Sequence, residues 1–256
     1  MTVDPSSLWF TRFKPGPQAS SRLFCFPYAG GGADIFRRWA LNLSPAIEVC
    51  AVQLPGRGRR INEPPCTRLL TMVDEIDIPI RAYLDKPFFF FGHSMGAIIA
   101  FELARRLRRE VGFGPSRLLV SGCRAPQLPN TDPKRHQLPD REFLEELEHL
   151  NGTPKEVLAH PEMVQYLLPT LRADFEAIEK YVYSPAPPLT CPISAFGGTD
   201  DPEVKAEQLE AWRDQTTSGF TLRMFSGNHF FIHDAEELLL RVVGLVLANT
   251  DLGPAR

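Results

Sequence analysis

The sequence predicts an α/β protein whose mostly parallel central sheet is flanked by helices, with a helical lid inserted before the strand that leads to a candidate acid. Short runs rich in Phe, Val, Ile and Leu alternate with longer stretches of helical periodicity, as in strands joined by helical crossovers. Several of these runs are apolar on both faces, as strands covered by helices must be. With 256 residues, of which 43% are hydrophobic and 23% charged, the chain can bury a sizeable core in one domain.

The expected elements follow a β-then-α order along the chain. Pro79 should kink or split the second helix, because its ring removes a backbone donor and clashes with the preceding turn. The expected strands cover residues 22–28, 47–54, 87–91, 117–122, 192–197 and 221–226. The expected helices cover residues 35–43, 67–84, 95–109, 203–215 and 235–247.

Residues 124–188 interrupt this alternation and are expected to form the inserted lid. A polar, proline-containing loop leads to helical patterns at 140–150 and 161–182, and residues 153–156 have the T-x-x-E form of a capping box. The rest shows no internal repeat, so we expect residues 1–256 to be a single domain carrying this excursion.

Charge and composition exclude several classes of protein. The net charge of −3 provides no general attraction for nucleic acid, and no run of about 18 apolar residues could span a membrane. The N-terminus has no apolar segment of the kind that directs secretion. The five cysteines form no C-x-x-C pair, so we expect them to be reduced and the protein to be cytoplasmic. These cysteines are Cys25, Cys50, Cys66, Cys123 and Cys191. We also expect the protein to be a monomer.

A candidate nucleophile lies between a buried strand and a helix. Residues 92–96 match G-x-S-x-G, with four phenylalanines before them and an apolar helical pattern after them. This is the context of a nucleophile elbow, in which glycines relieve crowding around a serine at a strained turn. Ser94 is therefore the expected nucleophile, although the pentapeptide alone is a weak pattern that can arise by chance. The amide of Met95, at the start of the helix, would help to stabilise an oxyanion.

A serine nucleophile needs a base and an orienting acid, which should follow it in that fold in the order acid, then histidine. Outside the motif and the insertion, only His229 and His233 remain, and His229 is favoured because it follows the last expected strand directly. For the acid, Asp200 and Asp201 compete at the end of the preceding strand. Because Asp201 precedes Pro202 and can cap the next helix, Asp200 is the predicted acid.

The second oxyanion donor should come from a loop after an earlier strand. Residues 26–32, Phe-Pro-Tyr-Ala-Gly-Gly-Gly, fit this role because consecutive glycines let the amide of Ala29 turn towards the site. A flexible glycine turn is the alternative. A phosphate-binding loop is disfavoured, since neither G-x-x-x-x-G-K-S/T nor G-x-G-x-x-G is present there.

Taken together, these motifs make the chain resemble the stand-alone type II thioesterases of polyketide and non-ribosomal peptide synthesis, which have the α/β-hydrolase fold. The resemblance covers nearly the whole chain and rests on the motifs at residues 26–32, 53–60, 92–96 and 227–231. It implies Ser94 as nucleophile, His229 as base and Asp200 as acid. It also implies the amides of Ala29 and Met95 as oxyanion donors.

The substrate that the resemblance implies is an acyl group held as a thioester on the phosphopantetheine arm of an acyl or peptidyl carrier protein. Hydrolysis to the free acid would remove stalled or aberrant chains, without a metal or other cofactor. Because such carriers are usually acidic, Arg57 and Arg59 are candidate carrier or phosphopantetheine contacts.

Three alternatives remain open at this stage. The first is a small-molecule carboxylesterase with the same triad, and the second is the terminal releasing domain of a synthase. The third is a non-catalytic hydrolase-fold protein that binds acyl chains or carrier proteins. Preference for carrier or pantetheine thioesters over simple esters would distinguish the thioesterase from the esterase.

Overall fold

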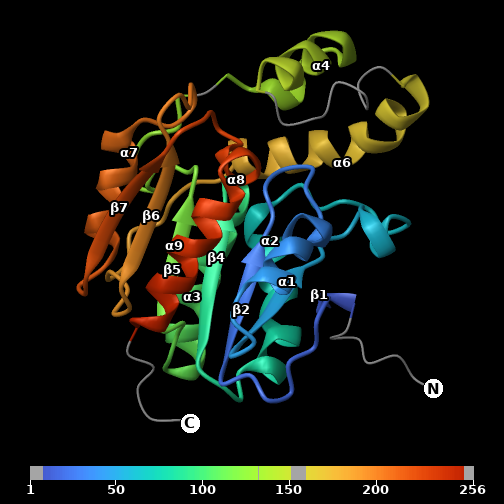
Figure 1. Ribbon diagram of the computed structural model, residues 1–256. Helices are drawn as coiled ribbons and strands as arrows, with labels where there is room; N and C mark the ends of the chain where they lie inside the picture. The colour runs from blue at the N-terminus through green and yellow to red at the C-terminus, as the bar shows by residue number, and fades with distance from the viewer. Residues whose placement is uncertain (1–7, 132, 151–159, 251–256) are drawn as a thin grey trace, which may run out of the picture.

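The computed structural model describes residues 8–131, 133–150 and 160–250, and its centre is a seven-stranded sheet (Figure 1). The strand order is β1-β3-β2-β4-β5-β6-β7, and every pair is parallel except β1 with β3. The strands are β1 (Phe10–Thr11), β2 (Ser21–Phe26), β3 (Ile47–Val52), β4 (Phe88–His93), β5 (Arg117–Ser121), β6 (Ile193–Gly198) and β7 (Phe220–Phe225).

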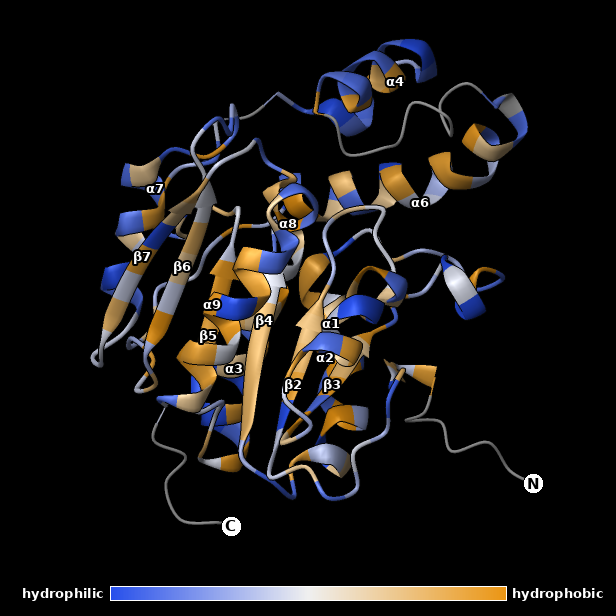
Figure 2. Cartoon of the chain, viewed as in Figure 1, coloured by the Kyte–Doolittle hydropathy of each residue, from blue (hydrophilic) through white to orange (hydrophobic). Residues whose placement is uncertain are grey.

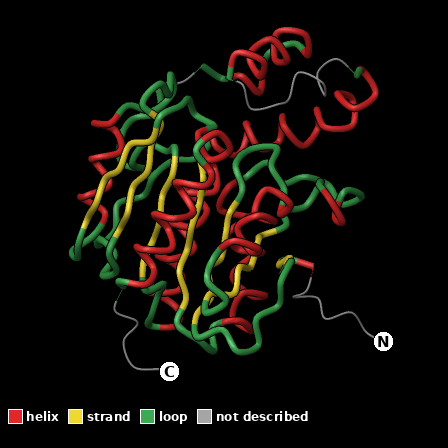
Figure 3. The backbone as a smooth tube through the Cα atoms, in the orientation of Figure 1, coloured by secondary structure: helices red, strands yellow, loops and turns green. Residues whose placement is uncertain are grey.

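Helices cover both faces of this sheet, and two more lie across one of its ends (Figures 1 and 3). Short 3-10 turns precede or follow several of them. The helices are α1 (Arg37–Asn42), α2 (Leu69–Ile80), α3 (Met95–Val111), α4 (Asp140–His149), α6 (Pro161–Glu179), α7 (Ala206–Glu210), α8 (Phe231–Asp234) and α9 (Glu236–Ala248).

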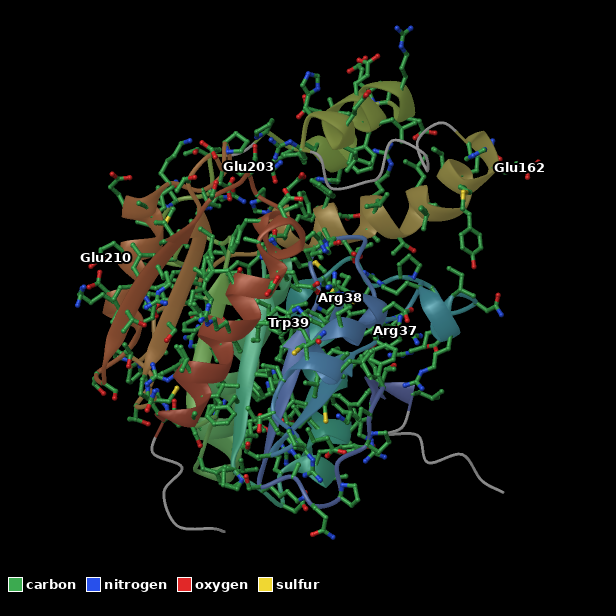
Figure 4. The ribbon with its side chains drawn as sticks, viewed as in Figure 1. Arg37, Arg38, Trp39, Glu162, Glu203 and Glu210 are labelled. Atoms are coloured by element: carbon green, nitrogen blue, oxygen red, sulfur yellow. The ribbon has the colours of Figure 1, made fainter. Side chains whose placement is uncertain are left out.

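Alternation along the strands builds two apolar layers, one on each side of the sheet. In β4, Phe88 and Phe90 pack against α2 and α3, whereas Phe89 and Phe91 pack against α1 and α9. Figure 2 shows the strands as largely hydrophobic, with polar residues gathered on the outer surfaces of the helices. In Figure 4, Glu210 on α7 and Glu162 on α6 mark opposite sides of the molecule. The sheet is thereby covered on both faces, as its sequence predicts.

The predicted strands and the parallel sheet flanked by helices are confirmed, with shifts of one or two residues at most strand ends. Strand β1 was not predicted, because two residues are too short for a hydrophobic pattern to be recognised. Pro79 lies one residue before the end of α2, and a 3-10 turn continues the chain at Arg81. The expected split of this helix therefore occurs just after the proline.

Helices α4 and α6 belong to the segment between β5 and β6 and lie across the end of the sheet where the parallel strands finish (Figure 1). Leu147 of α4 and Leu171 of α6 are both buried in a small apolar cluster of this segment. The predicted capping box at residues 153–156 lies outside the described residues. Among the helices that are described, none is long and apolar enough to cross a membrane.

Candidate active site

Ser94 occupies a strained turn between β4 and α3. Its backbone has φ 53° and ψ −120°, and it is the only non-glycine residue of the described ranges with a positive φ. A left-handed φ costs free energy for a side chain with a Cβ and persists only where the surrounding structure enforces it. The turn places Ser94 immediately before Met95, whose amide is the first of α3 and has no acceptor within the helix.

The glycines of the motif are required by close backbone approach. A Cβ on Gly92 would lie 2.1 Å from the carbonyl oxygen of Gly96, and a Cβ on Gly96 would lie 2.2 Å from that of Phe26. Both contacts are with main-chain atoms, which cannot rotate away as a flexible side chain could. The motif therefore brings the elbow and the end of β2 into direct contact.

His229 and Asp201 form a buried pair beside this turn. Nδ1 of His229 donates a hydrogen bond of 2.8 Å to Oδ2 of Asp201. The other carboxylate oxygen of Asp201 accepts the amides of Glu203 and Val204 at 2.8 and 3.1 Å. An ionised carboxylate can only accept hydrogen bonds, so this contact leaves Nε2 of His229 as the basic nitrogen.

The prediction that Asp200 orients the histidine is wrong. Asp200 is exposed, and its carboxylate accepts a hydrogen bond from the hydroxyl of the adjacent Thr199. The sequence favours Asp201 as a cap of the next helix, but the N-cap of α7 is Lys205, and Oδ1 of Asp201 instead caps the turn before that helix. A carboxylate has two oxygens, however, and Oδ2 remains available for His229. Capping and orientation are therefore compatible in one residue.

Backbone contacts between the loops after β6 and β7 hold this pair in place. The amide of Thr199 donates to the carbonyl of Phe225 at 2.8 Å, and the amide of Asp200 donates to that of Gly227 at 2.9 Å. A Cβ on Gly198 would lie 2.4 Å from the carbonyl oxygens of Gly227 and Asn228. The two loops thus emerge from adjacent strands as one connected unit.

The predicted oxyanion loop is a tight turn beside the elbow. The amide of Gly31 donates to the carbonyl of Tyr28 at 2.9 Å, and Gly30 has φ +77° whereas Ala29 is outside the positive-φ region. These features define a type II turn with Ala29 and Gly30 at its centre. Ala29 and Met95 both line the cavity that contains Ser94.

That cavity has a volume of about 520 Å³ and lies between the carboxyl ends of the strands and the helices above them. Ser94 and His229 line its floor, while Leu147 of α4 and Leu171 and Phe175 of α6 contribute apolar walls. Within the described part of the chain, no hydrogen bond joins Ser94 Oγ to the His229 ring. In ligand-free hydrolases this contact is commonly long and tightens with substrate.

Two further histidines lie close to His229. The ring of His93 is fully buried, 5.2 Å between ring centroids from that of His229, and burial holds the pKa of His93 well below its ordinary value. His233 lies in α8, before the terminal helix, with Nε2 2.8 Å from the hydroxyl of Tyr28. Burial raises the pKa of Tyr28 to about 12 and lowers that of His233, so both the phenol and the imidazole are neutral near pH 7.

The two arginines predicted to contact a carrier differ in their surroundings. Arg57 is 5% exposed and forms a bidentate ion pair with Asp174 of α6, so it offers no surface contact and this part of the prediction is wrong. Arg59 is exposed.

Asp174 was not singled out from the sequence, although it is an acid on the same helical face as Leu171, Phe175 and Ile178. An acid within an apolar stripe is a signal that could have identified it.

Within residues 8–131, 133–150 and 160–250, no cluster of three or more His, Cys, Asp or Glu side chains could hold a metal ion. Ser94, the oriented imidazole of His229 and the residues Ala29 and Met95 line one cavity. These are the components of nucleophilic acyl transfer.

Comparison with known proteins agrees with this chemistry. Residues 21–245 match the model of the thioesterase domain family. The chain is similar to the gramicidin S biosynthesis protein GrsT of Aneurinibacillus migulanus, with 46% identity over 94% of this chain and 95% of that protein. It is also 44% identical to the linear gramicidin dehydrogenase LgrE of Brevibacillus parabrevis, over 98% of this chain and 96% of that protein. The structure of BorB, a type II thioesterase of the borrelidin biosynthetic cluster, is similar with a TM-score of 0.86 and 38% identity, over 94% of this chain and 98% of that one.

Proposed function

Because this chain belongs to the thioesterase family, we propose that it hydrolyses acyl thioesters on the phosphopantetheine arm of the carrier proteins of non-ribosomal peptide or polyketide synthesis. The observation that carries the proposal is the shared cavity of Ser94 and of His229, whose Nδ1 is held by Asp201. Similarity to type II thioesterases of biosynthetic clusters supports the choice of substrate. The proposed role is removal of stalled or aberrant acyl groups.

The first half of the reaction acylates the enzyme. Ser94 Oγ attacks the thioester carbonyl while Nε2 of His229 takes its proton, and Asp201 stabilises the imidazolium through Nδ1. The carbonyl oxygen becomes an oxyanion, which the amides of Ala29 and Met95 stabilise. When the intermediate collapses, the C–S bond breaks and His229 returns the proton to the leaving pantetheine thiolate.

The second half releases the acid by the same groups. Water attacks the Ser94 ester while His229 takes a proton from it, and the two amides stabilise the second oxyanion. Collapse breaks the bond to Ser94 Oγ, which recovers its proton from His229. The apolar walls from α4 and α6 suit the acyl chain, and the cavity volume of about 520 Å³ falls in the usual range for small-molecule sites.

Docking of the carrier is proposed to involve Arg59. It is the exposed arginine of the 57–60 segment, since Arg57 and Arg60 are only 5% and 6% exposed. Nη2 of Arg59 donates to the carbonyl of Phe10 at 3.1 Å. An exposed cation attracts an acidic partner and raises the rate of encounter more than the strength of the final complex. Arg59 is therefore expected to act on carrier-bound substrate alone.

The test is intact-mass spectrometry of carrier proteins loaded with acetyl and longer acyl groups. Wild-type enzyme should remove the acyl mass, and Ser94→Ala should leave it in place. Equal loss with both proteins, or no loss with either across the acyl set, would contradict the proposal. Comparing a pantetheine thioester with the matched oxygen ester separates a thioesterase from a general esterase, which would cleave both with similar kcat/KM.

Dehydrogenase activity, which the name of LgrE suggests for that relative, is not favoured for this chain. The glycine-rich loop after β2 reads Gly-Gly-Gly-Ala-Asp-Ile from Gly30 and lacks the G-x-G-x-x-G spacing of dinucleotide-binding turns. The strained serine and the oriented histidine are instead the groups that acyl transfer requires.

A further inference from the structure

Arg57 and Asp174 join two segments that are 117 residues apart in the chain. Arg57 follows β3, and Asp174 lies in the middle of α6. Their side chains form two hydrogen bonds, Nη1 to Oδ2 at 2.5 Å and Nη2 to Oδ1 at 2.7 Å. With exposures of 5% and 0%, the pair is removed from water, so its geometry is not loosened by solvent.

The same carboxylate has a third partner in the predicted oxyanion loop. Oδ2 of Asp174 accepts the amide of Gly30 at 2.7 Å, and Nη1 of Arg57 donates to the carbonyl of Gly31 at 3.2 Å. The pair therefore holds both the middle and the end of the turn that contains Ala29. It touches this turn from the side of α6, through main-chain atoms only.

The bond to the Gly30 amide selects one form of the turn. In a type II turn the central peptide, here between Ala29 and Gly30, is rotated by about 180° relative to a type I turn. Rotation to the type I form would turn the Gly30 amide away from Asp174 and leave a buried carboxylate oxygen without that donor. The two forms share a φ of about −60° at Ala29 and differ in the ψ of Ala29 and the φ of Gly30. The contacts of Asp174 and Arg57 therefore fix the Ala29–Gly30 peptide and the end of the turn, and with them the place of the whole turn against α6.

We propose that Asp174, held by Arg57, is a positioning residue that anchors the Tyr28–Gly31 turn to α6 and so holds the Ala29 amide in place for the oxyanion. The inference rests on the proposed function, because Asp174 can position an oxyanion donor only if the Ala29 amide acts as one. It makes the oxyanion site depend on the position of α6, since the acceptor of the Gly30 amide comes from that helix.

If the Arg57–Asp174 pair served only to anchor α6, it would not need to contact the Tyr28–Gly31 turn. One turn earlier in the helix, Thr170 Oγ1 donates to the carbonyl of Gly56 at 2.6 Å, which already ties α6 to the loop after β3. Thr170 is 4% exposed, does not line the cavity and makes no contact of this kind with the Tyr28–Gly31 turn. Thr170→Val is therefore a matched control that removes an anchor of α6 without touching the oxyanion turn.

The test compares substitutions that leave the same buried cation unpaired but differ in the oxygen they offer. Asp174→Ala and Asp174→Asn both deprive Arg57 of its counter-charge, whereas only Asn retains an oxygen that can accept the Gly30 amide. With acetyl-pantetheine as substrate, kcat of Asp174→Ala should fall about 100-fold, the effect of losing one oxyanion donor, with KM within about threefold. Asp174→Asn should recover at least about tenfold of that loss, and Thr170→Val should stay within about threefold of wild type.

A second variant guards against loss of the fold. Arg57→Ala/Asp174→Ala removes both charges, so no unpaired ion is buried, and circular dichroism verifies that it is folded. The kcat of this double variant should remain about 100-fold below that of wild type. A kcat near that of wild type in this folded double variant would overturn the inference, as would equal losses in Asp174→Ala and Thr170→Val. If wild type itself fails to exceed Ser94→Ala on acetyl-pantetheine, it is the proposed function that fails.

Discussion

Nδ1 of His229 lies 2.8 Å from Oδ2 of Asp201, and the other oxygen of that carboxylate caps the turn that follows β6. One side chain therefore fixes both the loop and the tautomer of the imidazole. Its neighbour Asp200 points to solvent from the same loop. The same substitution, Asp to Asn, can therefore be made at the buried Asp201 and at the exposed Asp200.

Asp201→Asn should lower kcat by about 10³- to 10⁴-fold, because the amide no longer holds the productive tautomer or stabilises the imidazolium. Steady-state hydrolysis of acetyl-pantetheine provides the measurement. Asp200→Asn is the matched control and should keep kcat within about threefold of wild type. The reverse order of the two effects would restore Asp200 as the acid and contradict the role assigned to Asp201.

The order of the elements could be predicted from sequence because the apolar strands and the helical periodicity are local features. The placement of Ser94 follows from the same local pattern, since a strand and a helix on either side specify the turn between them. The choice between Asp200 and Asp201 could not be made in that way. It depends on which carboxylate faces the loop after β7, and that contact is set by the pairing of β6 with β7.

The incorrect prediction that Arg57 contacts a carrier has a similar origin. A run of arginines in a loop is typical of an exposed basic patch, and nothing in the local sequence shows which member turns inward. The buried carboxylate that pairs with Arg57 lies 117 residues away on α6. Long-range contacts of this kind become visible only when α6, a helix of the 124–188 segment, is placed over the sheet.

Arg59→Ala should lower kcat/KM for an acyl-carrier protein severalfold at low salt and leave acetyl-pantetheine unaffected. The effect should diminish as salt is added, because screening between exposed charges is strong beyond about 8 Å at physiological ionic strength. Arg109→Ala is a suitable control, since Arg109 is 69% exposed in its side chain but lies near the far end of α3 from Ser94. Equal effects of the two substitutions would indicate general charge attraction instead of docking at Arg59.

His93 should make the protein less stable in mild acid. Its pKa in the folded state is held well below the ordinary value by burial, so the unfolded chain binds more protons below about pH 6.5 and stability falls with pH. Between pH 7.5 and 5.5 this one group should remove on the order of 1 kcal/mol of the free energy of unfolding.

Urea unfolding of wild type and His93→Gln at the two pH values measures this contribution. Gln does not titrate but can still form a hydrogen bond with Ser121, whose hydroxyl lies 2.9 Å from Nδ1 of His93. Between pH 7.5 and 5.5 the free energy of unfolding of the variant should fall on the order of 1 kcal/mol less than that of wild type. The same pH dependence in both proteins would show that His93 does not titrate differently in the folded and unfolded states.

Ile178→Trp should restrict the length of the acyl group that the enzyme accepts. Ile178 is a partly buried residue of α6 that lines the cavity above Ser94, so a larger side chain reduces the space for the acyl chain. We expect kcat/KM for octanoyl-pantetheine to fall at least about tenfold, which corresponds to about 1.4 kcal/mol of lost binding, and that for acetyl-pantetheine to stay within about threefold. Met163→Trp adds the same bulk to a side chain of this helix that is 51% exposed and outside the cavity. It should change neither substrate's kcat/KM, and a uniform loss for both acyl lengths in Ile178→Trp would show that the cavity does not hold the acyl chain.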